Sequence, residues 1–192
     1  RVGQKVWGPA KTTERRLFGE AHWREPVKWN AAAEKAGVRA RVFCASMADV
    51  FEDHPALPAE RAKLWPLIEA TPWLDWQILT KRPENVLDMV PADWWMTGPA
   101  AFPDNVWIGT SVEDQQRANE RLPSLCEIPA AITFLSCEPL LGPIDLANIL
   151  HVDGERVTDA LLGETTYLPT TCIDTEPGAV SWVIVGSESG HG

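Results

Sequence analysis

The sequence has little of several features that mark specialised proteins. It contains only four cysteines and four histidines in 192 residues, and no apolar run approaches the roughly 20 residues of a membrane-spanning helix. The chain begins with no signal-peptide pattern. Lys and Arg number 17 against 27 Asp and Glu, which argues against a surface that coats nucleic acid but leaves room for a local basic pocket. These absences predict a cytoplasmic domain that does not contact a membrane.

The cysteines are too widely spaced for a metal motif. Cys44, Cys126, Cys137 and Cys172 lie far apart, whereas zinc ribbons and iron–sulfur motifs place their cysteines close together. Disulfides are not expected in a cytosolic domain. The cysteines can be small buried apolar residues, or Cys44 and Cys137 can be thiols beside a ligand, because both fall in or at the end of a predicted strand.

The composition suits one globular domain with a sizeable core. Hydrophobic residues make up 45% of the chain, and ten tryptophans are spread along it, which favours packing over a base-stacking platform. The chain opens without a Met and stops directly after its last predicted strand, where a crossover helix normally follows. We therefore interpret residues 1–192 as a single truncated domain.

Five segments share one pattern, an apolar or β-branched run followed by small and polar residues. Nearly continuous apolar runs of this length are typical of strands in a parallel sheet. Ligands of such sheets bind beyond the carboxyl ends of the strands, where this chain repeatedly places Ser, Thr, Lys, Arg and Glu. The predicted strands are 41–46, 76–82, 106–111, 132–138 and 182–188.

Helical patterns alternate with these strands, which predicts a βα series. An acidic stretch at about 151–180, with Gly, Pro and Thr, interrupts the pattern and reads as an exposed insertion, either a lid or a small hairpin. The predicted helices are 23–36 with Gly37 as its C-cap, 58–70, 83–89 with Pro83 at its first position, 111 to about 126, and 144–150.

Six blocks of the sequence, in order, resemble the phage protein gp-thirty-seven/gp-sixty-eight family, and together they span nearly the whole chain. They are Lys-Trp-Asn at 28–30, Arg-Val-Phe-Cys-Ala-Ser-Met-Ala-Asp-Val-Phe at 41–51, Leu-Thr-Lys-Arg-Pro-Glu-Asn at 79–85, Val-Trp-Ile-Gly-Thr-Ser-Val-Glu at 106–113, Phe-Leu-Ser-Cys-Glu-Pro-Leu-Leu-Gly at 134–142 and Trp-Val-Ile-Val-Gly-Ser-Glu-Ser-Gly at 182–190. At 186–188 the chain departs from the family, where a second Gly is more typical. Members of that family resemble radical S-adenosylmethionine enzymes.

The resemblance implies an α/β fold, a partial (β/α)6 TIM-like barrel with a mostly parallel sheet whose first strand is missing. It also implies a four-iron, four-sulfur cluster and S-adenosylmethionine as cofactors. The family's closely spaced cysteines are absent from residues 1–192, so the resemblance places the cluster ligands upstream of Arg1. The protein would supply binding and shielding for chemistry that the cofactor carries out.

The polar residues at the predicted strand ends are the candidate binding residues. Carboxylates can accept from ribose hydroxyls or an amine, Lys and Arg can hold a carboxylate or phosphate, and the two glycines allow close backbone approach. Glu113 and Glu138 can alternatively be acids at helix starts, one of them paired with Arg82. The candidates are Ser46, Asp49, Thr80, Lys81, Arg82, Gly109, Ser111, Glu113, Ser136, Glu138, Gly186 and Glu188.

Three functions remain open at this point. The chain can be part of a phage-associated radical S-adenosylmethionine-like enzyme, a non-catalytic barrel that binds a nucleotide or a partner protein, or a βα-barrel enzyme without a cluster. Its four histidines show no metal-ligand or triad spacing, which weakens the third reading. The substrate class, small molecule or nucleic acid, is not readable.

Overall fold

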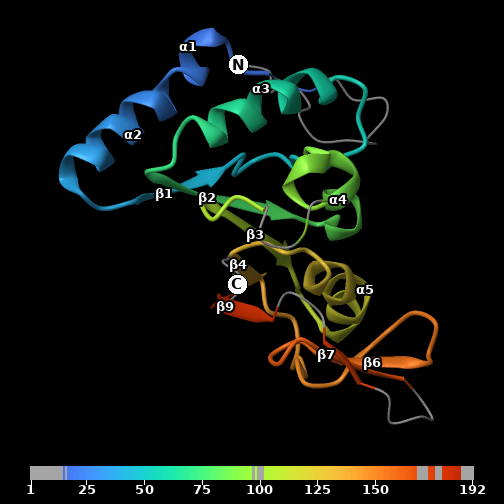
Figure 1. The fold of residues 1–192 in the computed structure, drawn as a ribbon. Helices are drawn as coiled ribbons and strands as arrows, with labels where there is room; N and C mark the ends of the chain where they lie inside the picture. Colours follow the sequence, from blue (N-terminus) through green and yellow to red (C-terminus); the bar gives the residue numbers. More distant parts are fainter. Residues whose placement is uncertain are drawn as a thin grey trace, which may run out of the picture.

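Five strands form a fully parallel sheet in the computed structural model of the protein (Figure 1). The structure describes residues 15, 17–96, 98, 102–167, 173–175 and 179–186. The order in the sheet is β1 (Ala40–Cys44), β2 (Leu74–Thr80), β3 (Val106–Ser111), β4 (Ile132–Cys137) and β9 (Val180–Val185). The prediction of an α/β fold around a parallel sheet is therefore confirmed.

The strand register brings the carboxyl ends together at one edge. Thr80 at the end of β2 lies opposite Thr110 on β3, and Ser111 lies opposite Ser136 on β4. The Thr110 hydroxyl donates a 2.9 Å hydrogen bond to the Thr80 carbonyl. We call this edge, with the loops that leave it, the carboxyl edge of the sheet.

Residues favoured at helix ends set where two of the helices begin or end. Gly37 ends α2 in the left-handed conformation at φ 67°, as predicted, and Pro58 occupies the first turn of α3. The predicted helix 83–89 consists of one 3-10 turn followed by a short α-helix. The helical elements are α1 (Glu20–Trp23), α2 (Glu25–Ala36), α3 (Pro58–Glu69), η1 (Pro83–Asn85), α4 (Val86–Met89), η2 (Ala92–Trp94) and α5 (Gln115–Cys126). No helix in the described residues is long and apolar enough to cross a membrane.

Two predicted helices are corrected by the structure. The helix placed from Ser111 begins only at Gln115, because the Asp114 carboxylate caps it by accepting a 2.8 Å hydrogen bond from the Arg117 amide. No helix forms over 144–150. The Asp145 carboxylate instead accepts from the Ala147 amide at 3.0 Å, a local turn bond that competes with helix formation.

A second, antiparallel sheet follows β4 in the chain. Its strands pair in sequence order, and it overlaps the stretch predicted as an insertion. Part of it is buried, since Ile149 and Ala160 have no exposed surface and His151 hydrogen-bonds Thr158 at 2.7 Å. The strands are β5 (Ile149–Leu150), β6 (Arg156–Asp159), β7 (Glu164–Tyr167) and β8 (Ile173–Thr175).

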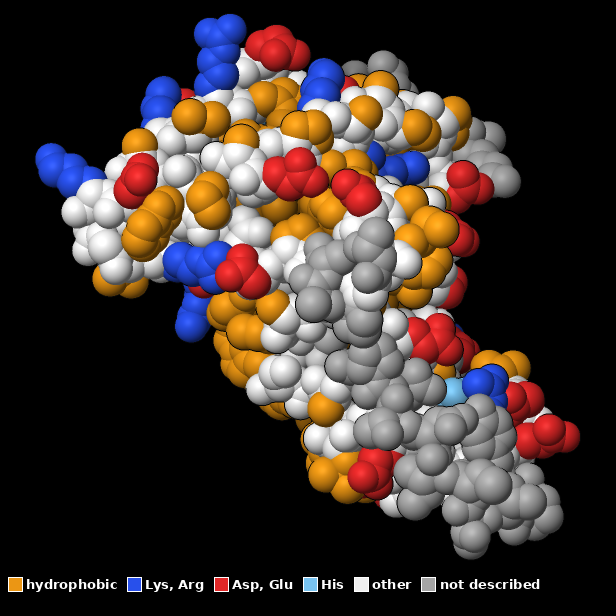
Figure 2. Space-filling model, viewed as in Figure 1, with side chains coloured by type: hydrophobic (Ala, Val, Ile, Leu, Met, Phe, Trp, Pro, Cys, Tyr) orange, Lys and Arg blue, Asp and Glu red, His pale blue; other side chains and the backbone are white. Residues whose placement is uncertain are grey.

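The two faces of the parallel sheet differ in what covers them. Alternate residues such as Trp76, Ile78 and Ile108 join the core formed with the helices. The opposite face carries Phe43 and Trp182, which remain 44% and 38% exposed. Hydrophobic side chains also reach the surface in Figure 2, on the side of the molecule away from α4 and α5. Parallel sheets are normally covered on both faces, so we call this second surface the open face.

Candidate functional site

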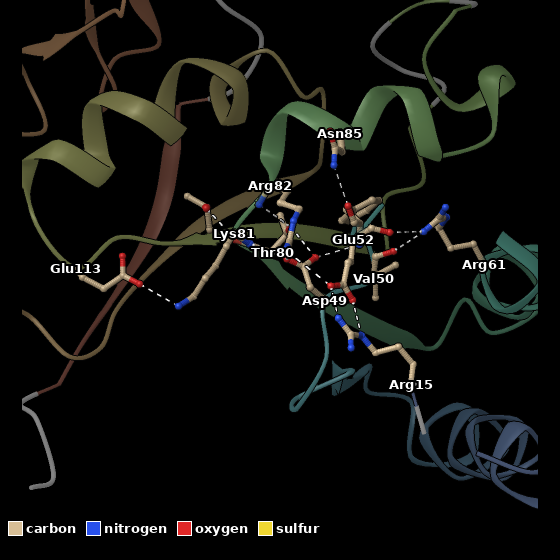
Figure 3. A network of polar contacts seen from close by, with 12 residues as sticks. Arg15, Asp49, Val50, Glu52, Arg61, Thr80, Lys81, Arg82, Asn85 and Glu113 are labelled. Carbon is tan, nitrogen blue, oxygen red and sulfur yellow. Dashed lines mark hydrogen bonds and ion pairs between the residues drawn. The ribbon is translucent and has the colours of Figure 1, made fainter. Parts of the chain in front are cut away.

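The Asp49 carboxylate is the centre of a polar network at the carboxyl edge (Figure 3). Its Oδ1 accepts hydrogen bonds from the Thr80 hydroxyl at 2.8 Å and the Phe51 amide at 3.0 Å. Its Oδ2 accepts from the Lys81 amide at 3.1 Å and forms a 2.8 Å ion pair with Nη1 of Arg82. One side chain from the loop after β1 therefore fixes the residues that end β2 and follow it.

Glu52 extends this network through two arginines. Arg15 donates from Nε at 2.9 Å and from Nη2 at 2.7 Å, a bidentate pair, and Nη2 of Arg82 lies 3.9 Å away. The hydrogen bonds from Arg15 hold the pKa of Glu52 below its ordinary value, against the opposing effect of burial. Arg61 donates to the Val50 and Glu52 carbonyls, and burial lowers its pKa. Glu52 is thus held ionised by fixed cations.

Glu113 forms a second group at the ends of β2 and β3. Nζ of Lys81 lies 3.1 Å from one of its oxygens, and Nη1 of Arg121 lies 3.0 Å from the other. Burial alone would raise the pKa of Glu113, but the Lys81 hydrogen bond and the two cations outweigh it, so the pKa is lowered overall. Lys81 remains 59% exposed, which leaves its ammonium accessible from solvent.

Glu138 differs from the other acids of the edge. It directly follows β4 and is exposed, and its side chain makes no hydrogen bond or ion pair with the described part of the chain. A Cβ added at Gly186 would lie 2.7 Å from the Glu138 Cδ, so the glycine leaves room for the carboxylate beside it. The Leu140 amide also donates to the Gly186 carbonyl at 3.1 Å. Glu138 is therefore an exposed carboxylate at the strand end that pairs with no cation among the described residues.

The remaining candidates lie in varied surroundings. Ser46 is exposed in the turn after β1, Ser111 is 7% exposed at the end of β3, and Ser136 lies on β4 opposite it. Gly109 leaves room for the Phe134 ring, which would be 2.5 Å from an added Cβ, so the expectation that its backbone approaches a ligand is replaced by a packing role. Glu188 lies outside the described residues.

Several residues of the network were not among the sequence candidates. Glu52, Arg61, Asn85 and Arg121 all contribute contacts, including a 3.0 Å hydrogen bond from Asn85 to the Phe51 carbonyl. Glu52 lies three residues after Asp49, and Arg121 lies eight residues after Glu113. The sequence signal that could have identified them was therefore a charged residue close in sequence to a candidate acid. Those charges had no strand-end position to distinguish them from ordinary surface residues.

The described residues do not fit an iron–sulfur cluster. They contain no group of three or more His, Cys, Asp and Glu that could hold a metal ion. Burial raises the pKa of Cys44 to about 12, and burial together with the Glu113 charge raises the pKa of Cys137. A cluster binds thiolates, whereas these thiols are kept protonated. Cys172 lies outside the described residues.

Residues 2–192 match a family described as "Protein of unknown function (DUF5131)". The chain belongs to this family. Comparison with curated proteins and with solved structures gave no match. The match covers both sheets, so the DUF5131 domain includes the antiparallel sheet as well as the parallel one that carries the polar network.

Proposed function

We propose that this DUF5131 domain binds a small polar ligand at the carboxyl edge, as the ligand-holding part of a radical S-adenosylmethionine-type enzyme. The observation that carries the proposal is Glu138, an exposed carboxylate at the end of β4 that pairs with no cation among the described residues. Lys81 supplies an accessible ammonium at the same edge. The Glu138 carboxylate and the Lys81 ammonium at one edge suit a ligand that carries both an amine and a carboxylate.

The sheet topology supports the barrel part of this proposal. The strands follow one another in a single direction, from β1 to β9, and the core residues of the helices pack against one face. A doubly wound sheet reverses its strand order and carries helices on both faces. One-directional order is typical of the wall of a (β/α) barrel, in which the open face would point inward.

Two residues would hold S-adenosylmethionine in this arrangement. Glu138 would accept hydrogen bonds from the methionyl amine or the ribose hydroxyls, and Lys81 would pair with the methionyl carboxylate. The cofactor supplies radical chemistry when it is bound to an iron–sulfur cluster. Because the described residues offer no ligand set for the cluster, we assign them binding and orientation only.

A non-catalytic module that binds a nucleotide or a partner protein is the second candidate. The packing of Cys137, which is 4% exposed, and of Cys44, which is partly buried, favours it, because a domain that had lost its cluster chemistry would retain cysteines only as packing residues. A phage-associated role stays a prediction of the resemblance, and the substrate stays open between a small molecule and a nucleic acid. Anaerobic reconstitution of the full-length protein separates the candidates, since iron and sulfide in stoichiometric amounts support the enzyme and their absence supports the module.

Glu138→Gln tests the ligand site directly. We expect S-adenosylmethionine to bind the full-length variant about 5- to 150-fold more weakly, the effect of losing a charge-assisted hydrogen bond worth about 1–3 kcal/mol. The melting temperature should stay unchanged, because Glu138 contacts no cation in the described structure. Glu127→Gln, which alters an exposed acid after α5, is the matched control. Equal affinity in both variants, or no binding by the wild type, would remove the proposal.

A further inference from the structure

Arg41 is held by two tryptophans across the open face. Its guanidinium carbon lies 5.1 Å from the centre of the Trp107 ring and 5.8 Å from that of Trp182. Arg41 is on β1 and Trp107 is on β3, so the side chain extends over β2 to make these cation–π contacts. The two indoles meet nearly at a right angle, 89°, with their centres 6.2 Å apart. The guanidinium therefore lies within cation–π distance of two aromatic rings.

The N–H edge of this guanidinium remains available. Arg41 makes no hydrogen bond or ion pair with the described residues. The neighbouring acid on β2, Asp75, lies opposite it in the strand register but forms its ion pair with Arg39, at 3.6 Å. Arginine held in this way presents a preorganised fork of donors, which matches a carboxylate.

A hollow adjoins the guanidinium. It has a volume of about 300 Å³ and is lined by Arg41, Trp107, Ile132, Ser181 and Trp182. This volume lies at the lower end of the range for small-molecule sites. Its walls are two indoles and an isoleucine, so it suits the flat apolar body of a ligand whose polar group reaches Arg41.

A buried amide on the same face lacks a partner. Gln77 is only 8% exposed, and its Nε2 makes no hydrogen bond with the described residues. It lies between Phe43 and Trp107 in the strand register, so it points toward the open face like they do. An unsatisfied buried donor costs about 1–3 kcal/mol. Gln77 does not line the hollow, so this cost belongs to the packing of the face and not to the ligand site.

We propose that the open face binds a small organic anion with a flat aromatic body. The anionic group pairs with the N–H edge of Arg41, and the ring lies in the hollow against Trp107 and Trp182. This site uses the first half of the strands and does not depend on the function proposed for the carboxyl edge.

Titration with 1-naphthoate, compared with its uncharged analogue 1-naphthamide, tests the proposal in the full chain. We expect calorimetry to show naphthoate binding with a dissociation constant below about 1 mM and naphthamide binding at least about tenfold more weakly. Arg41→Met should abolish the preference for the anion. Arg24→Met is the matched control and should retain the preference for the anion. Arg24 is an exposed arginine at the N-cap of α2, and its side chain pairs with none of the described residues.

Gln77→Leu separates ligand binding from folding. We expect naphthoate binding to stay unchanged, because Gln77 does not line the hollow. The melting temperature should stay equal or rise, because an unsatisfied donor is replaced by an apolar group of similar size. Binding by Arg41→Met as tight as that of the wild type would overturn the proposal. So would a dimer in sedimentation analysis that dissociates in Arg41→Glu, because the open face would then be an interface between two copies.

Discussion

The Asp49 carboxylate accepts a 2.8 Å hydrogen bond from the Thr80 hydroxyl, which joins the loop after β1 to the last residue of β2. The Thr80 hydroxyl in turn accepts from the Arg82 amide at 2.9 Å, and Arg82 returns to Asp49 through its guanidinium. This closed set of contacts fixes the backbone that presents Lys81 at the carboxyl edge. The site is therefore organised by residues that a ligand need not touch.

Replacing Asp49 by Asn should destabilise the fold. The change removes the charge that pairs with Arg82 and leaves part-buried donors without an ionised acceptor, so we expect the free energy of unfolding to fall by about 1–3 kcal/mol. Urea denaturation measures it. Asp88→Asn, at an exposed acid on α4, is the control and should change stability by less than about 0.5 kcal/mol. Equal stability of the two variants would contradict a structural role for Asp49.

Gly109→Ala should destabilise the sheet from its open face. The added methyl would lie 2.5 Å from the Phe134 Cζ, and Phe134 is itself only 1% exposed, so the ring cannot easily move away. Overpacking of this kind costs about 1–3 kcal/mol. Gly142→Ala, where an added methyl meets nothing within 4 Å, should be nearly neutral in the same denaturation experiment. Partial rescue by Phe134→Leu would identify the ring as the cause.

Acid should weaken the protein through Glu52 and Glu113. Both carboxyls have a folded-state pKa below their ordinary value of 4.5, so they stabilise the fold above that pH and lose this contribution as the pH falls through the folded pKa. We expect the free energy of unfolding to be level near pH 6 to 7 and to decline below about pH 4.5. The double variant Glu52→Gln, Glu113→Gln should decline less steeply. A double variant with the wild-type slope would assign the acid sensitivity to other groups.

The Cys44 thiol should react slowly in the folded protein. Its pKa is raised to about 12 by burial, so almost none is thiolate at pH 8, and the thiolate is the reactive form. Mass spectrometry after iodoacetamide treatment should show Cys44 labelled far more slowly in the native protein than in urea. Rapid native labelling at pH 8 would mean that the β1 end opens or that the thiol is not buried.

The parallel sheet was predictable because its signal is local. Each strand is a short apolar run ended by polar residues, and the helices between carry Gly37 and Pro58 at positions where only a few residue types are favoured. The false helix at 144–150 shows the limit of such signals. Asp145 is a residue type that can begin a helix, but its hydrogen bonds with Ala147 and Gln115 hold a turn there instead. Gln115 is thirty residues away, so this contact cannot be predicted from the local sequence.

The candidate site was only partly predictable for the same reason. Strand-end position singled out Asp49, Lys81 and Glu113, whose partners the sequence left undefined. Contacts between separate loops decide which carboxylate pairs with a cation and which stays open to a ligand. Lys81, for example, forms its ion pair with Glu113 and not with Glu138. No sequence signal marks the open face. Arg41 and Gln77 lie inside strands, and the alternation of side chains along a strand does not show which face of the sheet the helices leave uncovered.

The position of β9 beside β4 has a consequence for how the protein folds. Strands β1, β2 and β3 each pair with the next strand in the chain, whereas β4 pairs with β9 across residues 138–179. Closing so long a loop has an entropic cost, which folding of the antiparallel sheet reduces by shortening the free chain. Two hydrogen bonds complete the junction, from the Val180 amide to the Ala160 carbonyl at 2.8 Å and from the Thr133 hydroxyl to the Ala179 carbonyl at 2.7 Å. The antiparallel sheet and the last parallel strand therefore form one cooperative unit.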